Sequence, residues 1–385
     1  MKKNKHWVFV FSMIFILLIT TGFIFLQKEQ SHARTNDKLL IQEPHAIRSY
    51  AVTGKTYEQT VTLGAVGDIL IHDRVYEAAR TTDGFDFKPM FADVKHMMME
   101  PDLLLANQET ILAGEEIGLS SYPSFNSPHE VGFALLDAGV NIVSTANNHT
   151  LDRGERGIQL SMNFLNEIGL PYVGSFKDFE DKDTLRVLTN NGIKVAYLSY
   201  TYGTNGIPVP ENKEYLVNLI DKEAMKIEIH RATAEADIVV MSIHWGNEYQ
   251  RYPDEIQKEL AHFLVNEGVD IIFGHHPHVL QPMEWLKNKD GRKSLVVYSL
   301  GNFLSGQKWD YKDIGGIVSI EIKKQIGPSG TTIELGTPIF KPTYVSSYGQ
   351  RQYRLVPLEN AGDFGLVNAQ AKYDEIMAHM TENLN

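Results

Sequence analysis

The sequence has no cysteine among its 385 residues. Disulfides, thiolate zinc sites, cysteine nucleophiles and lipid attachment through an N-terminal cysteine are therefore all excluded. Positive charge is also scarce, because 36 lysines and arginines stand against 48 acidic residues and the net charge is −12. Such a chain lacks the phosphate-neutralising charge that nucleic-acid binding requires, so no nucleic-acid partner is expected. Any metal ligands must be histidine, aspartate, glutamate or asparagine.

The long apolar run of the chain lies at its N-terminus. Residues 7–26 carry no charge over 20 positions, which is enough for a helix that spans about 30 Å of hydrocarbon. The lysines within residues 1–6 favour a cytoplasmic N-terminus. We therefore predict a single-pass anchor in the cell membrane that holds the rest of the chain outside the cytoplasm. The alternative is a signal peptide with a small-x-small cleavage site at residues 31–33.

The rest of the chain has the composition of a globular protein, with 43% apolar and 22% charged residues over the whole sequence. Residues 27–58 are polar and lack periodicity, so we interpret them as an extracytoplasmic linker. Residues 59–359 are predicted to form one domain, and residues 360–385 a peripheral C-terminal helix.

Short apolar runs alternate with amphipathic segments from residue 59 onward. The runs are rich in β-branched residues and bounded by Gly, Asn or Asp, which is typical of buried strands. They cover residues 61–67, 102–106, 141–146, 194–200, 237–245, 270–274 and 295–300, and the helix-like segments cover residues 129–139, 156–169, 222–236 and 254–268. This alternation predicts an α/β fold with a largely buried sheet, closed on one side by antiparallel strands after residue 313.

Polar side chains stand at or just after the ends of these predicted strands. Ligands of open α/β sheets bind beyond the carboxyl ends of the strands, so we expect these groups to meet at one edge. The set consists of Asp68, Asn107, Glu109, Asn147, Asn148, His149, His244, His275, His276, His278 and Asn302. Imidazole, carboxylate and amide oxygen together suit Zn, Mn or Fe. The set therefore predicts one or two divalent metal ions.

Taken alone, each of these residues also has a purely structural interpretation. An aspartate after a strand is typical of a turn or a helix cap, and the Asn147-Asn148 pair is typical of an Asx turn. His244 beside an aromatic residue is typical of a hydrogen-bonded core histidine. His276 and His278 carry more weight, because clustered buried imidazoles repel one another when charged and lose solvation. The metal-site prediction therefore depends on the set as a whole.

The same segments follow one another in an order that resembles a known family. GDIL (67–70), NQE (107–109), ANNH (146–149), HWGNEY (244–249), GHHPHV (274–279) and YSLGNF (298–303) are similar to the motifs of CapA-type poly-γ-glutamate capsule biosynthesis proteins. These proteins form a group within the calcineurin-like metallophosphoesterase superfamily. The resemblance covers about residues 60–310. It implies a metallophosphatase-like four-layer α/β/β/α sandwich around a two-metal centre.

Carried over by position, the resemblance implies a role for each candidate ligand. Asp68 and His278 would hold the first metal, while Asn148, His244 and His276 would hold the second. Both sets mix histidine with an oxygen donor, in keeping with the metals that the residue types suggest.

Two positions depart from the superfamily pattern. Leu70 stands where the first motif has a histidine, although His72 lies nearby in the sequence. Glu109, one methylene longer, stands where the second motif has a bridging aspartate, and Asn107 is the other residue that this motif offers. These departures leave both a weakly held first metal and a mononuclear centre open.

His149 stands in the place of the histidine that protonates the leaving group or steadies the transferred phosphoryl group, and it is the predicted catalytic residue. Five further residues are predicted to contact substrate, namely His72, Asn107, Asn147, His275 and Asn302. The segments 120–128 and 201–210 are rich in turn formers and aromatics, so they are further candidates for binding loops.

Three hypotheses for the function follow. The first is an extracytoplasmic metal-dependent hydrolase of a cell-surface polymer or phosphoester, with His149 as general acid. The second is a non-catalytic capsule-assembly component that holds an anionic polymer such as poly-γ-glutamate, or membrane capsule-synthase subunits. The third is a metal-free receptor of the same fold. The resemblance favours a membrane-anchored role in poly-γ-glutamate biosynthesis or export, and it leaves turnover open.

Overall fold

A computed structural model of the protein describes residues 55–349 and 351–384. The predicted N-terminal segment 1–6, the predicted anchor 7–26 and all but the last residues of the predicted linker 27–58 lie outside the described residues. Residues Thr56–Asn385 form one compact unit. No helix within the described part of the chain is both long enough and apolar enough to cross a membrane.

The larger of two sheets is built around a long first strand. Its strands are β1 (Tyr57–Leu70), β2 (Leu103–Gln108), β3 (Ile142–Ser144), β4 (Tyr172–Val173), β11 (Asn302–Ser305), β12 (Ile314–Gly327), β13 (Gly330–Leu335), β14 (Ile339–Tyr348) and β15 (Gln352–Pro357). β1 pairs in parallel with β2 and β11 and antiparallel with β12, while β2, β3 and β4 continue in parallel. β12, β13, β14 and β15 are the antiparallel strands expected after residue 313.

The smaller sheet has six strands in the order β5-β6-β7-β8-β10-β9. Their bounds are β5 (Arg186–Asn190), β6 (Ile193–Thr201), β7 (Ile238–His244), β8 (Ile271–His275), β9 (Leu280–Lys287) and β10 (Lys293–Leu300). The four central strands run parallel, and the edge strands β5 and β9 are antiparallel to their neighbours. Every residue of β7 is buried, as expected for a parallel strand that is covered on both faces.

The two sheets share one hydrophobic core. Val61 and Leu63 of β1 belong to the same buried cluster as Val240 of β7 and Phe273 of β8. A second cluster lies on the other face of the smaller sheet, where α8 (Lys222–Glu235) and α9 (Glu255–Glu267) supply Ile229 and other apolar residues. The smaller sheet is therefore enclosed between the larger sheet and these two helices.

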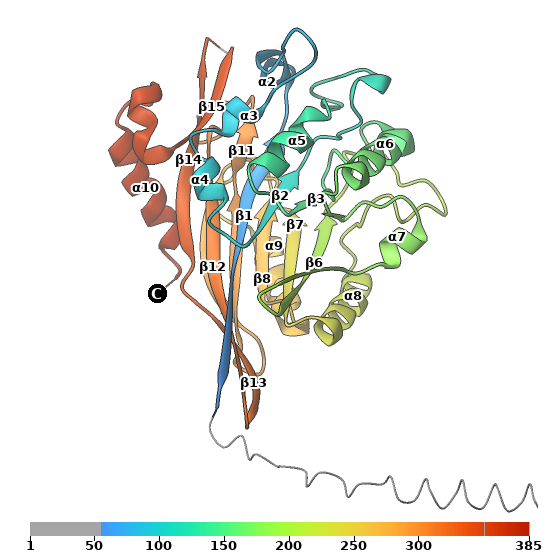
Figure 1. Cartoon of the computed structure of the whole chain (residues 1–385), viewed down its shortest axis with the longest axis vertical. Coiled ribbons are helices and arrows are strands. Elements are labelled where there is room, and N and C mark those ends of the chain that lie inside the picture. Colours follow the sequence, from blue (N-terminus) through green and yellow to red (C-terminus); the bar gives the residue numbers. More distant parts are fainter. Residues whose placement is uncertain (1–54, 350, 385) are drawn as a thin grey trace, which may run out of the picture. The chain divides into compact units, whose positions relative to one another are not determined.

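The remaining helices lie outside the second cluster, and all of them except α7 contribute side chains to the larger one. They are α2 (Asp73–Ala78), α3 (Lys88–Phe91), α4 (Lys95–Met98), α5 (Glu130–Asp137), α6 (Gly154–Glu167), α7 (Phe179–Asp183) and α10 (Ala369–Thr381), with short 3-10 turns at Glu115–Ile117 and Leu358–Phe364. Apolar side chains of α5 and α6 belong to the core, and α10 packs against β9 and β14. In Figure 1, α10 lies on the opposite side of the unit from α6.

The predicted α/β class is confirmed, and the two sheets are consistent with the two β layers that the resemblance implied. All seven predicted strands and all four predicted helices form, with ends shifted by a few residues. α9 shows why the local prediction works: Asp254 caps its N-terminus in a capping box with Gln257, and Gly268 ends it with a φ of 125°. The main difference is β1, which extends to Leu70, so that Asp68 lies inside a strand rather than after it.

Candidate metal centre

The predicted site residues come together where parallel strands of both sheets end. Asp68 comes from β1 of the larger sheet, and His278 comes from the loop between β8 and β9 of the smaller sheet. His278 Nδ1 lies 3.0 Å from Asp68 Oδ2, although the two residues are 210 positions apart in the chain. The edge of the sheets therefore joins residues that only tertiary structure can bring into contact.

Two buried carboxylates occupy the middle of this region. Asn107 Nδ2 donates a hydrogen bond to Asp68 Oδ1 (2.8 Å). Glu109 is also fully buried, but neither of its carboxylate oxygens has a hydrogen-bond partner among the described residues. The nearest ring nitrogens are His244 Nε2 at 3.6 Å and His278 Nε2 at 3.7 Å, which is too far for a hydrogen bond.

The imidazoles surround these carboxylates. His244 lies at the end of β7, and its Nε2 is 2.8 Å from Asn148 Oδ1. The ring centroid of His276 lies 4.8 Å from that of His244 and 5.9 Å from that of His278. Three histidines and one asparagine thus present nitrogen and oxygen donors to the same space.

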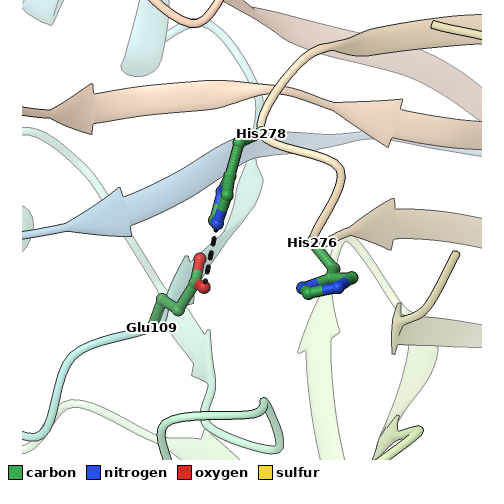
Figure 2. A group of neighbouring side chains, drawn as sticks. All are labelled: Glu109, His276 and His278. Carbon is green, nitrogen blue, oxygen red and sulfur yellow. Dashed lines mark ion pairs between the residues drawn. The ribbon is translucent and has the colours of Figure 1, made fainter. Parts of the chain in front are cut away.

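Two overlapping groups of side chains have the spacing of metal ligands. One consists of Glu109, His276 and His278, and the other of Asp68, Glu109 and His244; within each group the candidate ligand atoms lie within 4.8 Å of one another. Figure 2 shows the first group, in which Glu109 and His278 point toward each other and His276 approaches from the same loop as His278. Glu109 belongs to both groups.

The backbone around the ligands adopts unusual conformations. His276 and His278 have φ angles of 97° and 57°, a left-handed region that residues other than glycine rarely occupy. This conformation turns both imidazoles inward from a short loop. Strained residues of this kind cluster at active and ligand-binding sites, where surrounding contacts maintain them.

The two carboxyl groups differ in their proton affinity. Burial by itself would raise the pKa of Asp68, but the hydrogen bonds and charges of His275 and His278 outweigh it and hold this pKa well below its usual value. Burial, and after it the charge of Asp68, raises the pKa of Glu109 well above its usual value. Two neighbouring carboxyls with opposite shifts are typical of a functional site, and a cation between them would favour the ionised form of both.

Two of the histidines, His244 and His276, are neutral at physiological pH. Burial lowers the pKa of His276 to about 3, with a further contribution from His278. Burial, and after it His276, also lowers the pKa of His244 well below its usual value. Neutral imidazole is the form that ligates a metal, so these rings need not lose a proton before they bind one.

The residues present fit a divalent metal. A buried carboxylate without a hydrogen-bond donor is costly unless it is paired or coordinates a cation, and Glu109 is such a group. His244 Nδ1 and His276 Nδ1 are likewise buried without partners among the described residues. Imidazole, carboxylate and amide oxygens suit Zn, Mn or Fe. Asp68, Glu109, Asn148, His244, His276 and His278 are therefore the side chains that would hold one or two such ions.

His149, the predicted catalytic residue, is fixed beside the centre by a further carboxylate, that of Asp152. Its Nδ1 lies 2.7 Å from Asp152 Oδ2. The ring also contacts the edge of Phe125, with centroids 4.7 Å apart. With Nδ1 held by Asp152, Nε2 is the nitrogen that remains to exchange a proton with a ligand.

The residues predicted to contact substrate have mixed environments. Asn147 holds the turn, because its Nδ2 donates to the Gln108 carbonyl and its Oδ1 accepts from the His149 N–H. Asn107 orients Asp68, and His275 Nδ1 lies 3.3 Å from Asp68 Oδ1. Asn302 Nδ2 donates to the Lys312 carbonyl (2.8 Å), while its Oδ1 has no partner within the described residues.

His72 lies beside backbone groups. Its Nδ1 is 3.0 Å from the Leu70 carbonyl and accepts a hydrogen bond from the Gly306 N–H (3.2 Å). Burial lowers its pKa to about 4, so its ring is neutral. Leu70 itself is buried in the core, and its apolar side chain offers no ligand at the position where the resemblance implied a histidine.

Three residues of the site escaped the sequence analysis. Asp152 follows His149 by three positions, a spacing that would have signalled the contact. Asn205 accepts a hydrogen bond from Asn148 Nδ2 (3.2 Å), and the Tyr202 ring lies 4.7 Å from that of His276. Both belong to the predicted binding segment 201–210, but the sequence did not single them out, because nothing local links them to the centre.

Comparison with known proteins gives related capsule proteins. Residues 62–307 match the sequence model of the family described as bacterial capsule synthesis protein PGA_cap. The chain is 29% identical to the capsule biosynthesis protein CapA of Bacillus anthracis, over 84% of this chain and 74% of that protein. It is 27% identical to the PGA biosynthesis protein CapA of Bacillus subtilis (strain 168), over 84% of this chain and 78% of that protein.

Proposed function

Because the chain belongs to the bacterial capsule synthesis protein family PGA_cap, we propose that it acts in the biosynthesis or export of a poly-γ-glutamate capsule. The names of the two Bacillus relatives, which refer to capsule and PGA biosynthesis, support this role. The apolar run at residues 7–26 supports a single-pass membrane anchor with the domain on the extracytoplasmic side. An anionic polymer and membrane synthase subunits are the partners that this role requires.

The fold proposed for the domain is the metallophosphatase-like four-layer sandwich. Two sheets that share a core, with α8 and α9 on the outer face of one of them, support this architecture. The first and last layers of such a sandwich are helical, and α5 and α6 are the helices assigned to the layer outside the larger sheet.

The main support for a catalytic role is the buried cluster of side chains around Glu109. Its two unpartnered oxygens lie among imidazoles and the Asp68 carboxylate, at a spacing that supports binding of a divalent ion. When bound, such an ion supplies an electrophile for a substrate oxygen and lowers the pKa of a bound water. We therefore propose that the site hydrolyses a cell-surface polymer or phosphoester.

Side chains around the metal centre supply the proton transfer, the positioning and the exclusion of water. Asp152 holds the His149 ring through Nδ1 at 2.7 Å, which directs Nε2 toward a leaving group for proton transfer. Asn148 and Asn205 form a hydrogen-bonded pair beside this ring. The pair helps to hold His149 in place on one side of the metal centre. The Tyr202 ring covers His276 and excludes water from it.

The His149→Ala variant separates catalysis from assembly. A general acid contributes about 100- to 10,000-fold to the rate, so we expect turnover of phosphoesters or poly-γ-glutamate to fall by that factor while metal content is unchanged. His262→Ala, on the exposed surface of α9, is the matched control. Capsule formation should fail in the His149→Ala strain; a normal capsule would favour a non-catalytic scaffold that uses the metal for binding.

The metal itself is tested by elemental analysis of protein purified without chelators. One or two equivalents of Mn, Zn or Fe per chain are expected, with loss of metal in Glu109→Gln and His276→Ala variants. A chain that carries no metal and still supports capsule formation would favour the metal-free receptor of the same fold.

A further inference from the structure

A second group of polar side chains lies beside the metal centre and has no role in the proposed chemistry. Arg74 of α2 packs against Gly306, where an added Cβ would lie 2.5 Å from Arg74 Nε and 2.8 Å from His72 Cβ. Lys308 follows two positions later in the chain, and its Nζ donates to the Ser347 carbonyl (3.3 Å). We name Arg74, Lys308 and Tyr353 the basic cluster.

Tyr353 completes the cluster from the larger sheet. It stands opposite Ser347 in the register of β14 and β15, and so beside the residue that Lys308 contacts. Among the charged groups that act on Tyr353, Arg74 has the largest effect. Burial, and after it the charge of Arg74, lowers the pKa of Lys308. The β14–β15 register places Tyr353 and the residue that Lys308 contacts side by side, and Arg74 packs against Gly306, two positions before Lys308.

The charge of the cluster is not neutralised. Neither Arg74 nor Lys308 forms an ion pair with any residue that the structure describes. Arg74 Nε is buried without a hydrogen-bond partner there, and the Tyr353 side chain beside it is 3% exposed. Buried donors without partners are rare in native proteins and call for an explanation.

Two acidic residues, Asp73 and Asp313, act on the cluster, but each accepts a backbone hydrogen bond and neither forms an ion pair with Arg74 or Lys308. Asp73 Oδ1 accepts from the Arg74 backbone N–H (2.8 Å), and Asp313 Oδ2 accepts from the Trp309 N–H (3.1 Å). No ion pair within the described residues engages the guanidinium and ammonium groups, so an anion from outside the chain would be their partner.

The loop that carries Lys308 is strained. Its next residues, Trp309, Asp310 and Tyr311, have φ angles of 60°, 48° and 67°. Three consecutive left-handed residues other than glycine cost about 1–2 kcal/mol each, and strain of this kind is retained at ligand-binding sites. The conformation leaves the Trp309 side chain 72% exposed next to Lys308.

A short path of contacts joins the basic cluster to the metal centre. His72 lies between Gly306 and the Phe125 ring, with ring centroids 5.2 Å apart, and Phe125 contacts His149. A ligand at the basic cluster would thus be separated from a ligand at the metal centre by about two side chains, those of His72 and Phe125.

We propose that the basic cluster binds a second anionic group, a carboxylate or a phosphate, of the extended substrate whose reacting group lies at the metal centre. This inference rests on the proposed function. Arg74 supplies a planar fork for two oxygens, Lys308 a point charge and Tyr353 a hydroxyl donor. The exposed Trp309 ring offers a surface for the apolar stretch between two charged groups. A polymer with a carboxylate on every unit has the repeating charge that such a pair of sites requires.

The test is binding of two probes to the full-length protein in detergent, measured by fluorescence anisotropy. One probe is a labelled γ-linked glutamate oligomer and the other is labelled inorganic polyphosphate. We expect Arg74→Gln and Lys308→Gln each to weaken binding of the preferred probe about tenfold, the effect of one lost charged hydrogen bond. Tyr353→Phe, which keeps the buried ring, should weaken it about threefold.

Arg80→Gln is the matched control, because Arg80 lies just after α2 and already pairs with Glu77. It should bind like the wild type, and all four variants should keep the wild-type metal content and melting temperature. Equal binding by the wild type, Arg74→Gln and Lys308→Gln would overturn the basic cluster and leave the proposed function standing. Failure of the wild type to bind either probe would overturn both. Preference for one probe identifies the anionic group.

Discussion

Asn148 illustrates how single residues set up the centre, because an amide ligates through its oxygen only. Its Oδ1 lies 2.8 Å from His244 Nε2, and its Nδ2 donates to Asn205 Oδ1 (3.2 Å). The second hydrogen bond fixes which end of the amide faces the histidines. Asn205 has a φ of 51°, a conformation that asparagine tolerates better than most residues.

We predict that Asn205→Ala weakens metal affinity about tenfold, since residues that orient ligands typically contribute 10- to 100-fold. The measurement is competition with a chelating dye. Asn212→Ala is the matched control, because Asn212 is exposed in the same loop and has a similar φ of 61°. Asn205→Asp keeps the acceptor oxygen and should restore the affinity. Equal affinities of the Asn205→Ala and Asn212→Ala variants would contradict this role.

Asp270, at the opposite end of β8 from the histidines, should make stability depend on pH. Burial outweighs Arg292 and the Val239 N–H and raises its pKa to about 6. Between about pH 4 and pH 6 the folded state therefore binds more protons than the unfolded state, whose aspartate pKa is about 3.9. The contribution of Asp270 to stability is fully present below about pH 4 and is lost as the pH rises through about 6.

The Asp270→Asn variant removes this titration. We expect the free energy of unfolding of the wild type, relative to that of the variant, to fall across this pH range by about 1.4 kcal/mol for each unit of pKa difference. Urea unfolding at pH 4, 5, 6 and 7 measures it. A constant difference between the two proteins over that range would show that Asp270 ionises normally in the fold.

At the scale of elements, β1 places Asp68 at the metal centre. It can do so because the backbone of β1 at Gly67 closely approaches the backbone at Gly301. The Asp68 N–H donates to the Gly301 carbonyl (2.8 Å), and a Cβ at Gly67 would lie 2.0 Å from that same oxygen. The register between β1 and β2 shifts at this point. The glycine of the GD motif is thus explained by the approach of the turn between β10 and β11.

We predict that Gly67→Ala destabilises the protein by about 3 kcal/mol, because overpacking against a rigid backbone typically costs 1–3 kcal/mol. It should also lower metal content, since Asp68 moves with the strand. Urea unfolding and elemental analysis measure the two effects. Gly203→Ala is the control, because no atom lies within 4 Å of its added Cβ. A Gly67→Ala protein with normal stability and metal content would contradict this account of the motif.

At the scale of the whole molecule, the centre joins the two sheets. Asp68 lies in the larger sheet and Glu109 directly follows its strand β2, whereas His244 lies in the smaller sheet and His276 and His278 follow its strand β8. A cation bound between them would connect the sheets at their carboxyl ends, and it would be held by the folded state only. Metal binding should therefore stabilise the entire unit rather than one loop.

Removing the metal with a chelator should lower the melting temperature. A ligand at 100 times its dissociation constant stabilises the folded state by about 2.7 kcal/mol, which corresponds to roughly 5 °C for a domain of this size. Differential scanning calorimetry before and after chelation, and after re-addition of Mn or Zn, measures the shift. The His276→Ala variant should show a smaller shift. Identical melting temperatures with and without bound metal would contradict a centre that bridges the sheets.

The sequence by itself determined the local elements and most of the ligand set. Runs such as residues 237–245 are strands because consecutive β-branched and apolar residues bury both faces, and α9 forms because its caps and its apolar spacing agree. The candidate ligands were recognisable because imidazole, carboxylate and amide groups repeatedly follow such strands.

Only the tertiary structure decided which of those groups meet, and which residues support them. The strand order within each sheet, the pairing of β1 with β11 and the contact of Asn205 with Asn148 depend on residues far apart in the chain. The basic cluster likewise takes one side chain each from α2, from the loop that follows β11, and from β15. Local sequence sets backbone preference and burial, but the partner of a polar side chain is set by packing across elements, which no short segment encodes.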